Sequence, residues 1–232
     1  MANTTVTVNP SLYRQMPIDM MRDLLPVSIF AGQPNVMIVH PSLPAKSVKE
    51  FVAIATSRPG QLNYASAGTG SSSHIAAELF RMVAKVEIVH VPYKGNGPAL
   101  ADLVGGQVPM MFNNLAPSLP HVRSGKLLAL ATTGEQRSTV APDLPTMAEA
   151  GYPGVIFVLW VGLLAPAGTP ADIIAKLNGE TARAAQSREV QERLSGEGAE
   201  PYTTSPSQMA DIIRNETANW AKVVKAANIT PD

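Results

Sequence analysis

Short apolar, β-branched runs alternate with capped helix starts along most of this chain, and that alternation constrains its fold more than any other feature. Several of the runs are apolar on consecutive residues, which is typical of strands that are covered on both faces. Strands that alternate with helices build α/β folds with a mostly parallel sheet. We therefore predict an α/β fold with strands at residues 35–40, 62–66, 86–91, 109–112, 127–133 and 155–164.

Serine and threonine residues mark the predicted helix starts. Ser47 and Glu50 have the spacing of a capping box, in which each side chain accepts from a backbone amide near the other. Ser205-Pro206 places a cap before proline at the first helical position, and it starts the last long helix. The other predicted starts are Thr169-Pro170, the run Gly70–Ser73 and Gly97.

Charge and composition exclude several classes of function. The 232 residues include 18 basic and 18 acidic side chains, and the basic ones are scattered rather than clustered as a nucleic-acid site requires. The absence of cysteine excludes disulfides, thiolate catalysis and cysteine-held metals. The first residues lack the basic and apolar regions of a signal peptide. The longest apolar run, Val155 to Ala165, is about half a membrane-spanning helix.

Three turns that follow predicted strands carry residues suited to binding an anion. Ligands collect at the carboxyl ends of parallel strands, where helix amides point outward. The first turn is rich in glycine and serine, the second adds a positive charge and a phenol, and the third offers two side-chain amides. The candidate ligand-binding residues are Gly68, Thr69, Gly70, Ser71, Ser72 and Ser73, then Tyr93, Lys94 and Gly95, then Asn113 and Asn114.

Each turn also has an ordinary structural interpretation. A Gly/Ser-rich turn is often only a helix cap, and the Tyr93-Lys94 turn is compatible with plain exposure to solvent. We expect His74 to be packed and Glu78 to face water, and no histidine has a spacing that suggests a metal site. A small hydrolase that uses the Ser71–His74 turn is the alternative, although adjacent residues at a helix start diverge. We expect no catalytic residue, metal or cofactor.

A series of motifs runs along the chain in an order known from one family. The motifs include Asn9–Tyr13, Gly60–Ser66, His90–Gly95, Asp102–Val108 and Trp160–Pro166. Together they resemble the substrate-binding proteins of tripartite tricarboxylate transporters, also called the Bug family.

The resemblance implies a periplasmic protein that is not an enzyme, captures a small organic carboxylate and delivers it to the permease subunits of the transporter in the membrane. The implied architecture is a two-lobed, type II periplasmic-binding-protein fold. Residues 36–160 would form a complete lobe two, and residues 1–35 and 161–232 would form the remainder of lobe one, without the family's N-terminal βα units and signal peptide. Trp160, at a strand crossing between the lobes, joins the expected ligand-binding residues.

The missing N-terminal region has two expected consequences. A truncated lobe one would impair binding of the carboxylate, and it would leave apolar surface exposed for self-association. A fragment that no longer binds ligand and serves only as an interaction module is the second alternative to a solute-binding protein.

Overall fold

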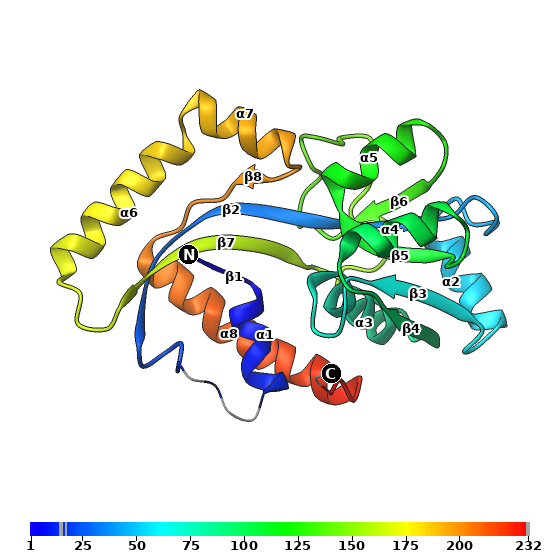
Figure 1. Ribbon diagram of the computed structural model, residues 1–232, viewed down its shortest axis with the longest axis horizontal. Coiled ribbons are helices and arrows are strands. Elements are labelled where there is room, and N and C mark those ends of the chain that lie inside the picture. Colours follow the sequence, from blue (N-terminus) through cyan, green and yellow to red (C-terminus); the bar gives the residue numbers. More distant parts are fainter. Residues whose placement is uncertain (14–15, 17, 231–232) are drawn as a thin grey trace. The chain divides into compact units, whose positions relative to one another are not determined.

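The computed structural model describes residues 1–13, 16 and 18–230, which form two compact units (Figure 1). Unit 1 consists of Met1–Gln33 and the chain from Leu159 onward, and unit 2 consists of Pro34–Val158. The sequence prediction placed its lobe boundaries at residues 36 and 160; positions 14, 15, 17, 231 and 232 of the predicted lobe one lie outside the described residues. Two strands carry the chain from one unit to the other, β2 (Leu24–Val39) and β7 (Val158–Pro166).

Unit 2 is built from short strands that alternate with helices. Each strand predicted within it is present, although β2 begins at Leu24, well before the predicted residue 35. After β2 the elements are α2 (Val48–Ser57), β3 (Leu62–Ser66), α3 (Ser72–Ala84), β4 (Ile88–Pro92), α4 (Asn96–Val104), β5 (Met110–Asn114), α5 (Leu115–Arg123) and β6 (Leu128–Thr132).

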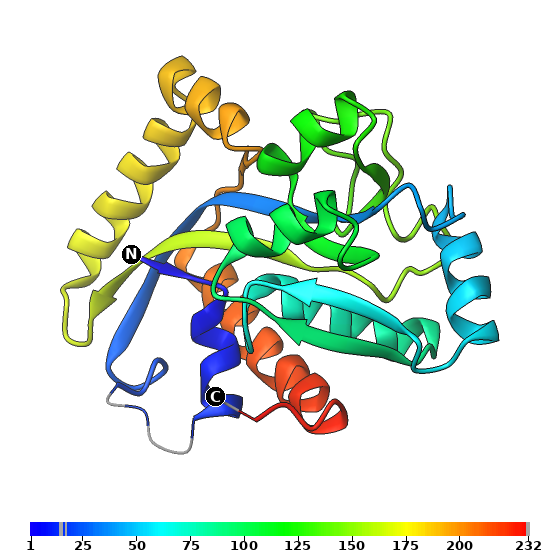
Figure 2. The same cartoon turned by 45° about the vertical axis from the view of Figure 1, so that its right-hand side comes forward.

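The sheet of unit 2 is mixed rather than mostly parallel. β3 lies between β4 and β5 and is parallel to both, and Figure 2 shows β3 and β4 side by side. β2 is antiparallel to β5 and to β6. The prediction of parallel pairing therefore holds for β3, β4 and β5 only, because an apolar run indicates a buried strand without indicating its direction.

Both faces of this sheet are covered, which explains the continuous apolar runs. Successive strand residues point to opposite faces. Met111 of β5 belongs to a core cluster with Leu103 of α4 and Leu115 at the start of α5. The next residue, Phe112, packs on the other face against Phe80 of α3, with ring centroids 5.7 Å apart.

The prediction that Glu78 faces water is wrong. Glu78 of α3 is buried, and it accepts a hydrogen bond from the hydroxyl of Tyr64 (2.5 Å). Arg81, one turn later, donates to the same carboxylate and forms an ion pair with it (2.6 Å). A carboxylate is buried only when it has hydrogen-bond or ionic partners. The tertiary fold supplies one of these partners, because Tyr64 lies on β3 and Glu78 on α3.

Unit 1 combines strand ends with packed helices. Its elements are β1 (Ala2–Asn3), α1 (Thr5–Leu12), the first part of β2, most of β7, α6 (Ala171–Ala185), α7 (Arg188–Gly196), β8 (Glu200–Pro201) and α8 (Pro206–Ala226). β1 is antiparallel to β7, β8 is antiparallel to β2, and α1 packs along α8. The core cluster of the unit consists of Ile29, Trp160, Met209 and Ile213.

The predicted helix caps are confirmed at three serines and wrong at one threonine. Ser47 caps α2 by accepting from the amide of Glu50 (3.2 Å), although the carboxylate of Glu50 accepts from the amide of Lys46 rather than from that of Ser47. Ser71 caps α3, and Ser205 caps α8 through a complete capping box. At α6 the N-cap residue is Pro170, and the hydroxyl of Thr169 donates to the carbonyl of Pro166 instead (2.8 Å). Helices α1 and α7 were not predicted, since α1 contains a proline and α7 is strongly polar.

Candidate functional site

The parallel strands β3, β4 and β5 all end at one edge of the sheet in unit 2. Ser66, the last residue of β3, is paired with Pro92, the last residue of β4, and β5 runs parallel to β3 on its other side. The three predicted turns therefore leave the sheet at the same edge. Asn35 of β2 is paired with Asn114 and reaches this edge from the neighbouring strand. We call this region the carboxyl edge.

The first turn at the carboxyl edge depends on glycine. Gly68 and Gly70 have φ angles of +121° and +76°, in the region that side chains rarely adopt. The amide of Gly68 donates to Oγ of Ser66 (3.1 Å). A Cβ at Gly68 would lie 3.1 Å from the backbone oxygen of Tyr93, so the turn has no room for a side chain there.

Serine hydroxyls join this turn to the start of α3. Oγ of Ser71 donates to the carbonyl of Gly68 (2.6 Å) and accepts from the amide of His74 (3.3 Å). Oγ of the buried Ser73 accepts from a backbone amide of the turn (2.9 Å). Ser72 and Ser73 are the first residues of the helix, where backbone amides have no intrahelical acceptor and are suited to an anion.

The same hydrogen bonds bear on the hydrolase alternative. The hydroxyl of Ser71 points to a backbone carbonyl, and Nδ1 of His74 accepts from the amide of Gly70 (3.1 Å). Both groups are engaged with the backbone of the turn. This arrangement does not favour a nucleophile paired with its base.

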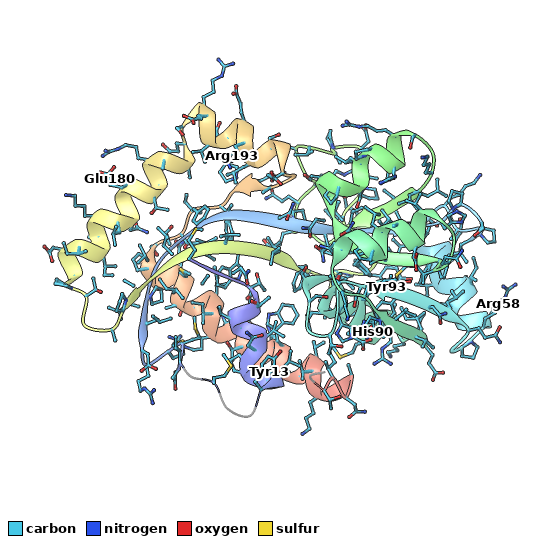
Figure 3. The ribbon with its side chains drawn as sticks, in the orientation of Figure 1. Tyr13, Arg58, His90, Tyr93, Glu180 and Arg193 are labelled. Carbon is cyan, nitrogen blue, oxygen red and sulfur yellow. The ribbon has the colours of Figure 1, made fainter. Side chains whose placement is uncertain are left out.

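The second turn is bonded to the first. The amide of Tyr93 donates to the carbonyl of Ser66 (3.0 Å), and the amide of Gly95 donates to a carbonyl of the first turn (3.1 Å). The hydroxyl of Tyr93 donates to Asp102 of α4 (2.7 Å), and burial, assisted by that carboxylate, raises the pKa of Tyr93. Lys94 is exposed. Figure 3 labels Tyr93 near the end of β4.

Four strand residues at the carboxyl edge have buried polar atoms without a hydrogen-bond partner in the described part of the chain, as does Asn96 at the start of α4 through its Oδ1. The atoms of the four strand residues are Nδ2 and Oδ1 of Asn35, Oδ1 of Asn113, Oδ1 of Asn114 and Oγ1 of Thr132. Asn113 and Thr132 flank Val36 on its two neighbouring strands. An unpaired buried polar group costs about 1–3 kcal/mol, so this arrangement favours a partner from outside the chain.

The sequence prediction missed two of these four residues. Asn35 and Thr132 lie inside predicted strands, where a single polar side chain is unremarkable in the sequence pattern. In the sequence, Asn35 is distinguished by being a polar residue at the start of an apolar run. Its significance depends on the pairing with Asn114, which only the sheet register reveals.

Trp160 lies in unit 1, where its side chain is 1% exposed. Its indole Nε1 donates to Oε2 of Glu216 (2.9 Å), and the hydroxyl of Thr7 donates to the same oxygen (2.9 Å). Burial raises the pKa of Glu216, although these hydrogen bonds act in the opposite direction. The backbone amide of Trp160 donates to Oγ1 of Thr4 (2.8 Å). Direct contact between Trp160 and a ligand stays a prediction.

The described residues contain neither a metal-binding cluster nor a membrane-spanning helix. Within residues 1–13, 16 and 18–230, no group of three or more His, Cys, Asp or Glu side chains is arranged to hold a metal ion. Over the same ranges, no helix combines the length and the apolar character needed to cross a membrane.

Comparison with known sequences gives one consistent result. The sequence model of the tripartite tricarboxylate transporter family receptor, TctC, matches residues 1–229. BugT of Bordetella pertussis is 38% identical over 224 residues, which cover 97% of this chain and 69% of BugT. A protein from the tcbD-tcbE intergenic region of Pseudomonas sp. strain P51 is 34% identical, with 96% of this chain and 66% of that protein covered.

Solved structures agree with the sequence comparison. An R. palustris protein with adipate is 38% identical, with a TM-score of 0.84, and the match covers 100% of this chain and 78% of that one. MatC from Rhodopseudomonas palustris with bound malate is 33% identical, with a TM-score of 0.79, 96% of this chain covered and 77% of that one.

Proposed function

The chain belongs to the tripartite tricarboxylate transporter receptor family, and from this premise we propose that it is a solute-binding protein for a small organic carboxylate. The ligands named for its structural neighbours, adipate and malate, are both dicarboxylates. A carboxylate needs several hydrogen-bond donors and no catalytic group. At the carboxyl edge, such donors are Nδ2 of Asn35, the hydroxyl of Thr132 and the first-turn amides of α3.

The single observation that carries the proposal is the set of buried, unpartnered polar atoms at the carboxyl edge. Nδ2 of Asn35 and the hydroxyl of Thr132 are donors without an acceptor in the described chain. The first-turn amides of α3 lie at the same edge and add donors with the favourable helix dipole. Together they can receive a carboxylate, while Oδ1 of Asn113 and Asn114 can accept from water or a ligand hydroxyl.

We propose a ligand-binding set that extends the sequence prediction by two residues. Its members are Gly68, Thr69, Gly70, Ser71, Ser72, Ser73, Tyr93, Lys94, Gly95, Asn113 and Asn114, with Asn35 and Thr132 added. Trp160 stays a predicted ligand-binding residue by the family resemblance, and its indole Nε1 donates to Glu216 within unit 1.

The remaining parts of the proposal rest on family membership. The structural neighbours include a periplasmic transporter and the periplasmic binding protein BugD, which supports a periplasmic location for this chain. A receptor of this family delivers its ligand to membrane permease subunits of the transporter, and we propose the same partners here. Capture without chemical conversion agrees with the engagement of Ser71 and His74 by the backbone.

The proposal is tested by thermal unfolding with adipate, malate, citrate and the neutral analogue adipamide. A ligand present at 100 times its Kd stabilises the folded state by about 2.7 kcal/mol. For a chain of this size that gain corresponds to a rise of about 5–10 °C in Tm. We expect such a rise with at least one carboxylate and none with adipamide. A clear rise would contradict the impaired binding expected from the sequence. Equal shifts with adipamide, or no shift with any compound, would refute carboxylate binding.

We also propose that a second copy of the chain covers helix α6. Ile173 and Leu177, spaced by one turn, are 43% and 41% exposed, and of the residues in α6 only Ala185 is buried. The side chain of Asn178 in α6 donates hydrogen bonds to the backbone carbonyls of Val27 and Thr204. A helix of this length is marginal in water without packing, so covering its apolar side stabilises it.

Light scattering after size-exclusion chromatography tests this association. We expect a concentration-dependent dimer for the unmodified chain and a monomer for Leu177→Glu. Met82→Glu, at an exposed apolar residue of unit 2, is the matched control and keeps the dimer. An unmodified chain that stays monomeric at every concentration contradicts the proposal, as does a Leu177→Glu variant that still forms dimers.

A further inference from the structure

Two histidine rings are stacked against each other next to the first turn of the carboxyl edge. The ring centroids of His74 on α3 and His90 on β4 are 3.8 Å apart, with 8° between the ring planes. His90 also stacks on Tyr64 of β3, at 5.0 Å. His74 is 4% exposed. Figure 3 labels His90, which lies in β4.

Each ring is hydrogen-bonded to a different part of the first turn. Nδ1 of His74 lies 3.1 Å from the amide nitrogen of Gly70, and because an amide can only donate, Nδ1 is the acceptor and carries no proton. Nε2 of His90 lies 2.6 Å from Oγ of Ser66, the hydroxyl that also accepts from the Gly68 amide. The pair is therefore bonded to Gly70 directly and to Gly68 through the hydroxyl of Ser66.

Protonation of this pair would oppose the observed geometry. A proton on Nδ1 of His74 would face the amide hydrogen of Gly70, so that bond would break. A charge on each ring would place two cations less than 4 Å apart. Among the titratable groups near the pair, Tyr64 on β3 stacks on His90 and donates to Glu78, which lies one turn after His74 on α3 and is paired with Arg81; β5 contributes none. Because Glu78 is already neutralised by Arg81, it does not compensate a second positive charge.

We propose that His74 is a positioning residue of the carboxylate site that must be uncharged for the first turn to bind its ligand, with the ring of His90 stacked on it. The inference rests on the proposed function and adds its regulation by protons. Binding would then weaken as the pH falls through the range in which histidine takes up a proton. The mechanism acts through the shape of the turn, since His74 holds Gly70 and His90 holds Ser66.

Three proteins separate this mechanism from a general structural role. His74→Asn places a carbonyl oxygen where Nδ1 stood, so it keeps an acceptor for the Gly70 amide but does not titrate. In His74→Leu, the leucine side chain has the same branching as asparagine but offers no acceptor for the Gly70 amide. The unmodified chain completes the series. Thermal unfolding at pH 7.5 first establishes that each variant is folded.

The affinity for adipate is then measured by calorimetry at pH 7.5 and pH 5.5. A turn that binds adipate only while His74 is uncharged makes the unmodified chain lose more affinity between these pH values than the titration of adipate itself removes. His74→Asn loses only what the titration of adipate itself removes, which is common to all three proteins. His74→Leu binds about fivefold more weakly at pH 7.5, the value of about one hydrogen bond.

A second readout needs no ligand and separates failure of this inference from failure of the proposed function. We expect the amide resonance of Gly70 in the free protein to move between pH 7.5 and 5.5 in the unmodified chain and to stay fixed in His74→Asn. If adipate does not bind but the resonance behaves in this way, the carboxylate function fails while the proton-sensitive contact stands. A resonance that moves equally in His74→Asn, or an equal loss of affinity in both proteins, overturns the inference.

Discussion

Replacing Asn35 with leucine tests whether the unpartnered polar atoms at the carboxyl edge lower the free energy of unfolding and contribute to ligand affinity. The side chain of Asn35 is fully buried, and neither Nδ2 nor Oδ1 has a partner in the described part of the chain. Its backbone amide and carbonyl are both bonded to Thr133, so a substitution leaves those bonds intact. Leucine has the same number and branching of side-chain heavy atoms, so it replaces two unpartnered polar atoms by methyl groups.

The magnitude follows from the cost of leaving buried polar groups unpaired. Removing that penalty is expected to stabilise the folded state by about 2 kcal/mol. For a chain of this length the gain corresponds to about 4–8 °C in Tm. Asn178→Leu is the matched control, because Nδ2 of Asn178 donates to the carbonyls of Val27 (2.9 Å) and Thr204 (2.8 Å). The same substitution there loses two hydrogen bonds and is expected to cost about 2 kcal/mol.

Thermal and urea unfolding measure the two variants, and calorimetry with adipate measures their binding. We expect Asn35→Leu to be more stable than the unmodified chain and to lose most of its affinity, whereas Asn178→Leu is less stable. If Asn35→Leu is destabilised to the same degree as Asn178→Leu, the argument from unpaired atoms is refuted. If it is stabilised but binds adipate unchanged, Asn35 has no part in the carboxylate site.

Three further substitutions test other parts of the structure. Gly68→Ala adds a Cβ 3.1 Å from a backbone oxygen at a positive φ and is expected to cost about 1–3 kcal/mol in urea unfolding, whereas Gly97→Ala, with open space, is the mild control. Burial raises the pKa of Glu216 above its ordinary 4.5, so the stability from its neutral form is full below pH 4.5 and is lost as the pH rises through the raised value. Glu216→Gln therefore gains in Tm relative to the unmodified chain as the pH rises from 4.5 to 7.5, and a constant difference would contradict the raised pKa. Tyr64→Phe removes the hydroxyl that donates to the buried Glu78 and is expected to cost about 1.5–3 kcal/mol in the same unfolding assay; an unchanged midpoint would show that this bond contributes nothing.

Local sequence signals predicted most elements of unit 2. The cap at Ser71 and the glycines after α4 act within one turn of the chain, so their effect is legible without tertiary information. The apolar runs located β3, β4, β5 and β6 to within one or two residues. Strand direction was beyond the same signal, and β2 proved antiparallel to its neighbours.

The candidate site was partly predictable for a related reason. Ligand sites in α/β sheets follow the carboxyl ends of parallel strands, so the turns after β3, β4 and β5 could be chosen from their order in the sequence. The structure brings those turns to one edge. Asn35 and Thr132 could not be identified as site residues from the sequence. They are candidates because their buried side-chain polar atoms have no partner among the described residues, and this is known only once the surrounding strands have packed.

The sequence by itself determined where most helices and strands of unit 2 form, which turns carry glycine and hydroxyl groups, and which family the ordered motifs belong to. These properties depend on short-range sterics and on residue identity. The tertiary structure alone decided that Glu78 is buried beside Tyr64, that His74 stacks on His90, and that the side-chain amide of Asn35 has no hydrogen-bond partner among the described residues. Those outcomes depend on burial and on contacts between distant residues, and the energy of a polar group is set by the neighbours that replace water around it.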